Sequence, residues 1–492
     1  RDRLRSRGLG DVYKRQAQEL CKAVGYNSGR IQGTEPVNIK MKLPEKYINS
    51  MKELIGDKEL SDYLASFDKP RQYGLRVNTA KISVEDFLAV SPFKLKPVPW
   101  IPNGFYYEEE DKPAKHPYYF AGLYYLQEPS AMTPACVLPV EEGECVLDLC
   151  AAPGGKSTEL GAKLCGSGLL VSNDVSASRI KALLKNIEVF GIGNVIVTCE
   201  YPEKLADNFG TFFDKILVDA PCSGEGMFRK DNKLIKSWES QGPEFYAPIQ
   251  KNILDNAARM LKAGGSIVYS TCTFSQMEDE DNIRYFLEKH PEFRLERIYD
   301  YEGFVRAFGM EEAIRLFPHH LDGEGHFVAL LVKDGEEVYR RTVNVNGGFA
   351  SGKIPSELKE FLDELDVDYD MSRMVSNGEK IYYMPEYMPD MKGIRSMRTG
   401  LLMGELKKNR FEPSQALAMT IKRGEYTTTA DFEPDDIRVI KYLKGETIEA
   451  DENSLHGKSK NVLITVNGYP LGWGRINGYT IKNKYLPGWR WM

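Results

Sequence analysis

Short apolar runs alternate with amphipathic stretches through the middle of the chain. The runs that predict buried strands are Cys145–Cys150, Leu169–Asp174, Val195–Cys199, Lys215–Ala220, Ser266–Cys272 and Phe327–Val332. Helical periodicity separates most of them, as in Ser176–Phe190 and Pro243–Leu261. Repeated strand–helix units favour a parallel, doubly wound sheet. We therefore predict an α/β domain over residues 131–335.

The pattern changes on both sides of this domain. Residues 41–130 mix helices with short strands such as Tyr73–Asn78, which predicts an N-terminal α+β domain. On the other side, Asn344–Gly348 has the composition of a turn or linker. Residues 345–400 then predict a small mixed α/β domain of ferredoxin-like type, with a helix at Glu357–Leu365.

Residues 401–492 predict a compact β-rich module. The apolar run Val462–Val466 has the character of a strand, and Asn467-Gly468 comes directly after it. Asn-Gly is a strong signal for a tight turn between antiparallel strands. A hairpin is therefore expected at this point.

Residues 1–40 differ in character from the rest of the chain. Arg1–Gln16 is rich in arginine, lacks a helical or strand period, and resembles a sequencing or cloning scar. A clean helical pattern opens after Met41. We expect residues 1–40 to be a non-native or disordered extension and Met41 to be the natural start.

Composition narrows the class of protein. The chain has 492 residues, of which 42% are hydrophobic and 28% charged, as in soluble proteins of several domains. It contains no apolar run of about 18 residues and no secretory pattern, so no membrane segment is expected. Its eight cysteines form no disulfide framework and no zinc spacing. A cytoplasmic protein without a metal is predicted.

Charge is distributed unevenly along the chain. The net charge is −6, yet no Asp or Glu occurs from Asn453 to the end. A basic surface on an acidic protein is typical of phosphate binding. Ordinary solvated charge is the alternative. The cations of this segment are Lys458, Lys460, Arg475, Lys482, Lys484 and Arg490.

A glycine turn comes after the first strand of the α/β domain. Its glycines allow close approach of a ligand, and the helix that begins there presents free N–H groups. Asp174 ends the next strand, where a carboxylate is placed to bind ribose hydroxyls. The two features predict a nucleoside-bearing cofactor; a purely structural turn is the alternative.

The same turn partly matches a phosphate-binding loop, G-x-x-x-x-G-K-[ST]. Gly155-Lys156-Ser157 fits the end of this pattern, but Cys150 stands where its first glycine belongs. Pro153 also removes an N–H donor that such a loop needs. Hydrolysis of nucleoside triphosphates is therefore disfavoured.

Two cysteines come after two other predicted strands. Cys222 lies in Asp219–Gly224 and Cys272 in Ser270–Thr273. Because parallel strands present their carboxyl ends on one edge, the two thiols are expected to share a pocket. Thiols are strong nucleophiles, which indicates covalent catalysis. Singly, each would more often be a small buried residue.

Three motifs, CAAPGGKST, DAPCSGEGMF and STCT, resemble in this order the Nop/Sun family of S-adenosylmethionine-dependent RNA 5-methylcytosine methyltransferases. The likeness extends from about Met41 to the end and is greatest for bacterial enzymes that act on ribosomal small-subunit RNA. It implies a Rossmann-like methyltransferase sheet, an N-terminal RNA-binding domain, and a PUA-like RNA-binding module at residues 401–492. The implied cofactor is S-adenosyl-L-methionine.

The resemblance also implies roles for the residues of the site. Cys272 attacks carbon 6 of the cytosine, and Cys222 assists release. Asp219 holds the ring nitrogen and lies beside the sulfonium, and Lys156 contacts the base. The cofactor-binding residues implied are Cys150, Ala151, Ala152, Pro153, Gly154, Gly155, Lys156, Asp174 for the ribose, Glu200 near the adenine, and Asp219.

The partner implied is RNA, most readily 16S ribosomal RNA, bound by a monomer. Cations after the Cys222 loop and near the end of the chain are expected to meet phosphates. C-terminal aromatics suit unstacked bases, or equally the core of a small barrel. The predicted RNA-binding residues are Arg229, Lys230, Lys458, Lys460, Arg475, Lys482 and Lys484.

Other functions stay open at this stage. One is methylation of transfer RNA. Another is DNA cytosine methylation, because DNA methyltransferases take their nucleophile from a Pro-Cys motif and Pro221-Cys222 is similar to it. The STCT motif and the C-terminal module disfavour this function. A third is a non-catalytic RNA-binding assembly factor, which intact Cys222 and Cys272 disfavour.

Overall fold

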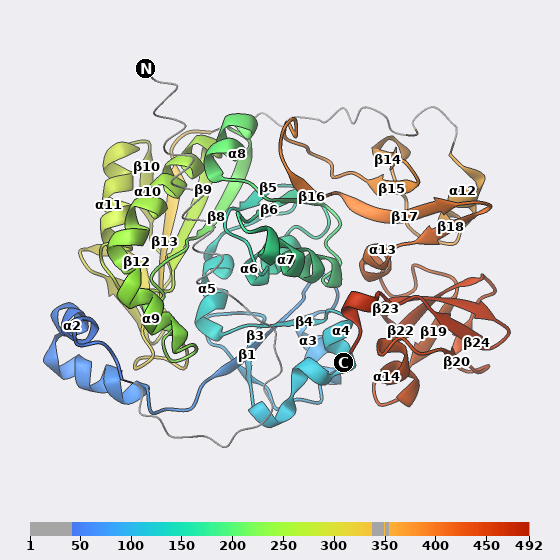
Figure 1. Cartoon of the computed structure of the whole chain (residues 1–492), viewed down its shortest axis with the longest axis horizontal. Helices are drawn as coiled ribbons and strands as arrows, with labels where there is room; N and C mark the ends of the chain where they lie inside the picture. The colour runs from blue at the N-terminus through green and yellow to red at the C-terminus, as the bar shows by residue number, and fades with distance from the viewer. Residues whose placement is uncertain (1–41, 337–348, 350–353, 492) are drawn as a thin grey trace.

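The computed structural model describes residues 42–336, 349 and 354–491. The predicted extension at residues 1–40 and the predicted linker Asn344–Gly348 lie outside the described residues. The α/β domain occupies the middle of the molecule, with N-terminal elements below it and C-terminal sheets beside it (Figure 1). Among the described residues, no helix has the length and apolar character to cross a membrane.

The central sheet has the order β11-β12-β13-β9-β8-β5-β6-β7-β16. Strands β9, β8, β5, β6 and β7 run parallel. The chain winds from β5 toward β7 on one side and toward β9 on the other, which makes the end of β5 a ligand-binding switch point. The parallel strands are β5 (Cys145–Asp148), β6 (Leu169–Asn173), β7 (Val195–Thr198), β8 (Phe213–Asp219) and β9 (Leu261–Thr271). The predicted doubly wound fold is confirmed.

An antiparallel extension widens the sheet beyond β9. Strand β13 pairs antiparallel with β9, so the last strand predicted from the sequence reverses direction relative to the others. The strands of this extension are β10 (Phe293–Glu296), β11 (Phe304–Ala307), β12 (Met310–Leu316) and β13 (His326–Lys333).

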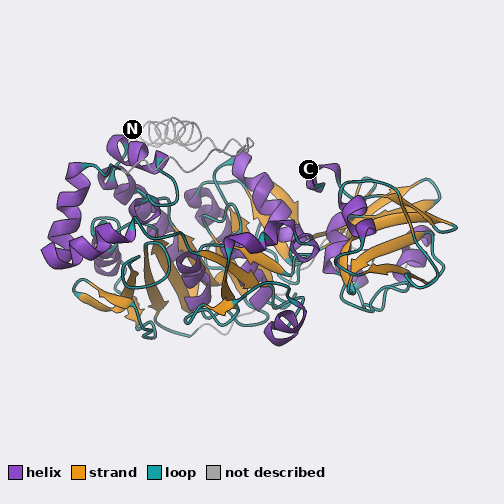
Figure 2. Ribbon diagram, turned by 90° about the horizontal axis from the view of Figure 1, so that it is seen from below, coloured by secondary structure: helices purple, strands orange, loops and turns teal. Residues whose placement is uncertain are grey.

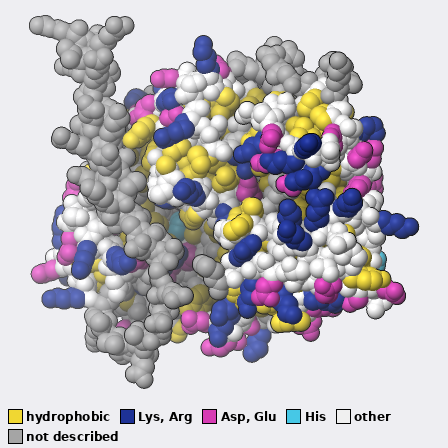
Figure 3. Space-filling model, turned by 45° about the vertical axis from the view of Figure 1, so that its right-hand side comes forward, with side chains coloured by type: hydrophobic (Ala, Val, Ile, Leu, Met, Phe, Trp, Pro, Cys, Tyr) yellow, Lys and Arg dark blue, Asp and Glu magenta, His cyan; other side chains and the backbone are white. Residues whose placement is uncertain are grey.

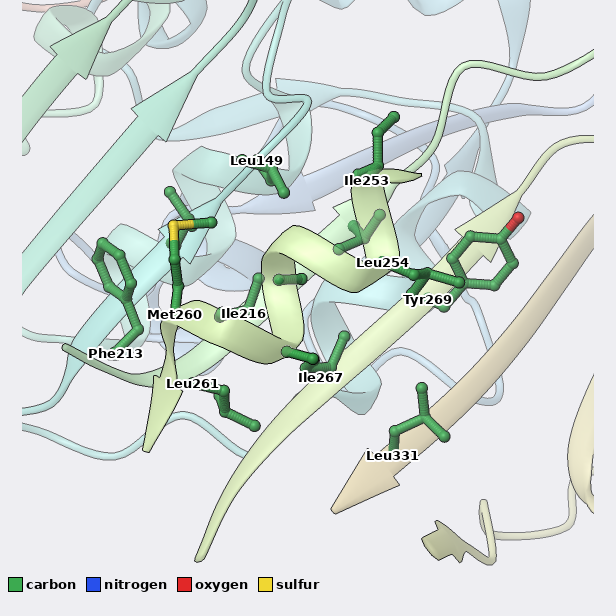
Figure 4. Packing of buried hydrophobic residues seen from close by; sticks show 14 of the residues in the cluster. Leu149, Phe213, Ile216, Ile253, Leu254, Met260, Leu261, Ile267, Tyr269 and Leu331 are labelled. Carbon is green, nitrogen blue, oxygen red and sulfur yellow. The ribbon is translucent and has the colours of Figure 1, made fainter. Parts of the chain in front are cut away.

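Helices bury apolar side chains on both faces of the sheet. On one face, Ile253, Leu254 and Met260 of α10 pack over Ile216 of β8 and Ile267 of β9 (Figure 4). Burial of each such side chain contributes about 1.5–3 kcal/mol, which anchors the strand ends that carry the site. The helices of this domain are α5 (Pro129–Val137), α6 (Gly155–Lys163), α7 (Ala177–Val189), α8 (Pro202–Phe209), α9 (Lys233–Ser240), α10 (Pro243–Met260) and α11 (Glu280–Lys289).

The N-terminal elements form a sheet of order β2-β3-β1-β4 and a long helix, α2. Tyr47 and Tyr63 of α2 are buried against Phe228 and Phe274, which lie just after the two predicted catalytic loops. The N-terminal region is thereby packed onto the site. Its elements are α2 (Glu45–Ser66), β1 (Tyr73–Val77), α3 (Val84–Val90), β2 (Lys96–Pro97), β3 (Gly104–Tyr107), α4 (Pro117–Phe120) and β4 (Tyr124–Leu126).

The first C-terminal sheet is an antiparallel meander, β14-β15-β17-β18. A ferredoxin-like domain interleaves its strands as βαββαβ, and this order differs from it. Because β15 pairs with β17, the predicted boundary between residues 400 and 401 falls inside this sheet. The elements are α12 (Ser356–Leu362), β14 (Met374–Asn377), β15 (Lys380–Tyr383), β17 (Leu401–Lys407), β18 (Arg410–Pro413) and α13 (Gln415–Thr420).

The last sheet has the order β20-β24-β23-β22-β19-β21 and, with the first C-terminal sheet, forms the β-rich lobe at the right of Figure 2. A hairpin joins β22 to β23 at Asn467 and Gly468, whose φ angles of 48° and 80° suit the predicted turn. Trp473 and Trp489 are buried, so these aromatics belong to the core. The elements are β19 (Thr429–Phe432), α14 (Ile437–Leu443), β20 (Ile448–Glu449), β21 (Leu455–His456), β22 (Asn461–Val466), β23 (Tyr469–Asn477) and β24 (Thr480–Asn483).

Strand β16 (Ser396–Thr399) joins the central sheet although it is far from that sheet in sequence. It pairs antiparallel with β7 and so completes the edge of the sheet. The Arg398 guanidinium also pairs with Glu188 of α7 at 2.6 Å. The sequence did not predict this strand, because Ser396–Thr399 has no alternation of polar and apolar residues.

Candidate active site

The turn between β5 and α6 forms one wall of the site. Gly154 has a φ of 110°, and a Cβ there would lie 3.0 Å from Leu183. Glycine is therefore required at this position. The Ala151 N–H donates to the Asn173 carbonyl at 2.7 Å, which ties the turn to the end of β6. Gly155 then begins α6.

A buried arginine from the N-terminal sheet holds the same turn. Arg76 of β1 is 1% exposed, and its Nη2 donates to the Gly155 carbonyl at 2.5 Å. Its Nε pairs with Glu159 at 2.8 Å, one turn further along α6. Arg76 thus joins the N-terminal region to the start of the helix. The sequence predicted a strand at Tyr73–Asn78 but assigned no role to Arg76.

A cavity of about 370 Å³ opens between this turn and the N-terminal sheet. The turn contributes Cys150, Ala151, Ala152, Pro153, Gly155 and Lys156 to its lining, as the resemblance implied. Asp148 and Asp219 lie at the strand ends, while Tyr73 and Tyr125 come from the N-terminal sheet. Lys230 and Glu324 also line it.

A lysine and an aspartate pair at the floor of the cavity. The Lys156 Nζ lies 2.7 Å from Asp219 Oδ2, and the Ser270 hydroxyl donates to Oδ1 at 2.8 Å. Burial alone would raise the pKa of Asp219, but Lys156 and Ser270 outweigh it and hold the pKa below its usual value. Asp219 is therefore an anion in position to accept a hydrogen bond.

Asp148 has unused hydrogen-bonding capacity beside this pair. Its Oδ2 accepts from the Ser157 hydroxyl at 2.6 Å, whereas its buried Oδ1 has no hydrogen-bond partner among the described residues. Burial raises the pKa of Asp148 to about 7. A donor or cation bound in the cavity would satisfy this oxygen. S-adenosylmethionine, which carries an ammonium and a sulfonium, fits a floor of two carboxylates.

The two cysteines meet at the ends of β8 and β9. Their sulfur atoms lie 3.2 Å apart, and the Cys272 N–H donates to the Cys222 sulfur at 3.3 Å. The contact with Cys272, together with burial, raises the pKa of the Cys222 thiol well above its usual value. Both thiols come shortly after Asp219 and Ser270 along the chain, but neither lines the cavity described above.

A buried glutamate, Glu278, and a pair of hydroxyl groups hold the loops that carry the cysteines. Glu278 accepts from the Ser223 N–H at 2.9 Å and from Gln250 at 2.8 Å, next to Cys222. Burial raises its pKa to about 7. The Ser223 and Thr273 hydroxyls lie 2.7 Å apart, which links the two loops directly. None of these residues lines the cavity. Ser223 and Thr273 belong to the two cysteine motifs, whereas no sequence motif marked Glu278 or Gln250.

Asp174 lies behind the turn. It is 3% exposed, and its carboxylate accepts from the N–H groups of Ala152 at 3.2 Å and Ser176 at 2.8 Å. The Arg179 guanidinium lies 3.3 Å from the same carboxylate. Asp174 and Gly154 do not line the cavity described above. Asp174 therefore organises the turn through contacts with protein groups.

Glu200, expected near an adenine, contacts protein groups. Its Oε1 pairs with Lys204 at 2.6 Å and accepts from the Arg395 N–H at 2.8 Å. Arg395 immediately precedes β16. The structure thus places Glu200 outside the cavity lining, where it fastens β16 to the end of β7.

The cations expected to bind RNA fall into different environments. Arg229 is largely buried, and its Nε lies 3.5 Å from Glu324, so it is not a surface cation. Lys230 lines the cavity. Arg229 is buried because the segment after Cys222 packs against α2 and does not project from the surface.

The C-terminal cations lie on the β-rich lobe. Arg475 of β23 stands directly opposite Lys482 of β24. Lys458, Lys460, Lys482 and Lys484 are exposed, and Arg475 is half-buried. Lys and Arg side chains gather on the face that Figure 3 brings forward. Like charges placed opposite each other destabilise a strand pair, so this arrangement favours an anionic partner.

A group of possible metal ligands lies away from the cavity. Among the described residues, Glu59, His319 and His320 place ligand atoms within 4.8 Å of one another. His320 Nε2 and Glu59 already lie 3.0 Å apart as a hydrogen-bonded pair. We assign no metal to this group.

Comparisons with families of known proteins cover nearly the whole described chain. Residues 135–332 match the family described as 16S rRNA methyltransferase RsmB/F. The flanking regions match the N-terminal domain of 16S rRNA methyltransferase RsmF (43–129), the RsmF rRNA methyltransferase first C-terminal domain (360–421) and the methyltransferase RsmF PUA domain (429–491).

Curated relatives are similar along nearly their full length. The ribosomal RNA small subunit methyltransferase F of Photobacterium profundum is 31% identical over 473 residues, which cover 91% of this chain and 97% of the relative. The enzyme of the same name from Vibrio atlanticus is 33% identical over 465 residues, covering 90% and 96%.

Solved structures share the fold of the central region. A methyltransferase homolog protein from Pyrococcus horikoshii is 29% identical with a TM-score of 0.52, covering 60% of this chain and 96% of its own. NSun6 from Pyrococcus horikoshii, 24% identical with a TM-score of 0.52, covers 60% of this chain and 99% of its own and supports the fold alone.

Proposed function

Because the chain belongs to the ribosomal RNA small subunit methyltransferase F family, we propose that it transfers a methyl group from S-adenosylmethionine to carbon 5 of a cytosine in small-subunit ribosomal RNA. The observation that carries this proposal is the pair of thiols, 3.2 Å apart, beside the Lys156–Asp219 pair. A thiol next to a held carboxylate suits an attack on a pyrimidine ring that the carboxylate orients.

The cofactor supplies an electrophilic methyl group on its sulfonium. The residues that would hold it are the turn from Cys150 to Lys156, with Asp148 and Asp219 facing its positive charges. Asp174 is our candidate for the ribose. Glu200 stays our candidate for the adenine, although the structure supports it less than it supports Asp174 for the ribose. The reason is that Glu200 Oε1 already accepts from Lys204 and Arg395.

The protein's residues would act on the base in sequence. Carbon 5 of cytosine is a weak nucleophile, so the Cys272 thiolate first forms a bond to carbon 6, which makes carbon 5 enamine-like. The electron pair displaced in the ring is taken up when N3 gains the proton that the Cys272 thiol gives up. The anionic Asp219 then accepts a hydrogen bond from this N3–H, and Lys156 donates to the carbonyl at carbon 2. Carbon 5 can then accept the methyl group.

Release requires loss of the proton on carbon 5. We assign this proton to Cys222. The contact with Cys272 and burial raise its pKa, so the thiol must first lose its own proton to solvent, and the thiolate that results is a strong base. The electrons of the broken C–H bond restore the double bond between carbons 5 and 6, and the Cys272 thiolate leaves. N3 returns its proton to the departing thiolate, so the ring is neutral 5-methylcytosine and Cys272 is again a free thiol.

The C-terminal lobe is our proposed docking site for the RNA. Arg475 and Lys482 face each other across β23 and β24, and Lys458, Lys460 and Lys484 lie exposed on the same lobe. Lys230 at the cavity would meet a phosphate near the target. We propose a cytoplasmic monomer acting on ribosomal RNA.

The test is methyl transfer from labelled S-adenosylmethionine to purified small-subunit RNA, to assembled small subunits and to transfer RNA, with nucleoside analysis of each product. We expect labelled 5-methylcytidine from one of the ribosomal substrates. If only the transfer RNA became labelled, the substrate would be transfer RNA and not ribosomal RNA. Labelled 5-methyluridine, or label on a base nitrogen, would overturn the proposed chemistry.

A further inference from the structure

Glu324 lies on the segment that leads into β13, directly beside the Cys272 loop. The Gly226 N–H donates to the Cys272 carbonyl at 2.9 Å, and the Gly325 N–H donates to the Gly226 carbonyl at 3.1 Å. Phe327 pairs with Thr271 in the sheet. The segment of Glu324 is thereby fixed next to the loop of the proposed nucleophile.

The carboxylate of Glu324 is buried and short of hydrogen bonds. The residue is 4% exposed and lines the cavity together with Lys156 and Asp219. Its Oε2 has no hydrogen-bond partner among the described residues; the Arg229 Nε lies 3.5 Å away. Burial raises the pKa of Glu324 to about 7. A buried carboxylate in this condition is costly unless a bound donor completes its shell.

The backbone around Glu324 is held by neighbouring residues. The Glu324 N–H donates to Glu128 Oε1 at 2.9 Å, and Glu128 is itself fixed at the start of α5. At the preceding position, a Cβ on Gly323 would lie 2.3 Å from the Ser130 hydroxyl. The Glu324 backbone is therefore fixed, and the carboxylate itself is held by the Arg229 guanidinium, 3.5 Å from its Oε2.

The other polar groups of the cavity already have assignments. Asp219 accepts from Lys156 and Ser270, and its remaining capacity suits the ring nitrogen once that nitrogen is protonated after addition at carbon 6. Lys156 is a donor and suits a carbonyl. What a cytosine still presents is its exocyclic amino group, a donor, where uracil carries a carbonyl, an acceptor. An unsatisfied carboxylate is complementary to the first and repels the second.

We propose that Glu324 accepts a hydrogen bond from the exocyclic amino group of the target base and so makes the enzyme discriminate cytosine from uracil. This inference rests on the proposed function. Sites built to hydrogen-bond a substrate group reject analogues that lack it, because buried polar groups are then left unpaired. Glu324 would reject uracil at carbon 4 of the base, while Lys156 contacts the carbonyl at carbon 2.

The test compares one RNA substrate with cytidine or uridine at the target position. For Glu324→Gln, we expect kcat/KM on cytidine to fall about 10- to 100-fold and 5-methyluridine to form on the uridine RNA, since an amide can either accept or donate. Asp322→Asn removes an exposed carboxylate two positions away and should leave both values unchanged. Melting temperature and S-adenosylmethionine affinity verify the fold of each variant.

A second variant tests the proposal if Glu324→Gln fails to fold. Glu324→Asp keeps the charge but withdraws it by one methylene, so cytidine methylation should slow while uridine stays unmethylated. An unchanged preference in Glu324→Gln, or methylation of uridine by Glu324→Asp, would overturn the assignment. A wild-type protein that methylates no cytosine would instead overturn the proposed function itself.

Discussion

The sulfur atoms of Cys222 and Cys272 lie 3.2 Å apart, although 50 positions separate the residues in sequence. Strands β8 and β9 are parallel neighbours, so the loops at their carboxyl ends converge. The contact couples the two thiols, because a change at one sulfur alters the surroundings of the other. Which thiol attacks the base is decided by replacing each in turn.

Cys272→Ala should abolish methyl transfer and form no covalent complex with RNA, since it removes the proposed nucleophile. Cys222→Ala should still attack and methylate but release poorly, because the base for the carbon 5 proton is lost. A protein–RNA adduct should then survive denaturing electrophoresis. An adduct with Cys272→Ala and none with Cys222→Ala would reverse the assignment, and full turnover by both would exclude covalent catalysis through them.

Asp174→Ala should weaken S-adenosylmethionine binding by roughly 10- to 150-fold, the effect of losing hydrogen bonds worth about 1.5–3 kcal/mol. Calorimetric titration measures it. Asp174 also contacts the Arg179 guanidinium and the Ala152 N–H, so Arg179→Gln is the control. An equal loss in Arg179→Gln would mean that the carboxylate acts through the turn, and native affinity in Asp174→Ala would place the ribose elsewhere.

Arg76→Met should lower the free energy of unfolding by about 3–5 kcal/mol, because it leaves the buried Glu159 carboxylate without its cation. Denaturant titration should show this, and S-adenosylmethionine affinity should fall as the start of α6 loosens. The double variant Arg76→Met/Glu159→Met removes both charges and should recover part of the stability. No recovery would show that the loss comes from packing and not from the unpaired charge.

Glu278 should make stability depend on pH. Its pKa in the folded state, about 7, lies above the ordinary glutamate value, so the folded protein keeps this proton longer than the unfolded chain. Its contribution is therefore present at low pH and is lost as the pH rises through about 7. Glu278→Gln mimics the protonated form, and its unfolding free energy should decline less than that of the wild type between pH 5 and 8. If the unfolding free energies of Glu278→Gln and the wild type changed equally with pH, Glu278 would not be a source of the pH dependence.

Lys482→Gln and Arg475→Gln should each weaken RNA binding and reduce the slope of log affinity against log salt by about 0.7–0.9, the effect of one lost phosphate contact. Lys359→Gln is the matched control, because it removes an exposed charge that pairs with Asp363 on the far end of α12. Filter binding at several salt concentrations measures the slopes. Slopes equal to that of Lys359→Gln would make the lobe a structural module only.

Strongly apolar elements were predictable from the sequence. Leu169–Asn173 and Val195–Thr198 are continuous runs that a buried parallel strand accommodates, and their ends differ little from those expected. The two cysteine motifs were likewise expected to meet, because strand order alone brings them together. These predictions needed only local patterns and the rules of parallel sheets.

Residues whose partners are distant in sequence could not be placed in this way. Arg229 carries the charge of a phosphate ligand, yet it is largely buried beside Glu324. Glu200 comes after a strand as an adenine ligand would, yet it contacts Arg395. Whether a charge faces solvent or another charge depends on tertiary contacts that no local pattern encodes.

Strand β16 has a consequence for how the enzyme can be dissected. A fragment ending at residue 335 would contain every strand of the central sheet except this one and would leave the β7 edge with unpaired N–H and C=O groups. Exposed edges of this kind invite pairing between molecules. The catalytic unit is therefore discontinuous in sequence: a truncation at the end of the α/β domain would create an aggregation-prone protein, whereas a fragment that rejoins residues 394–400 to the sheet would remain monodisperse.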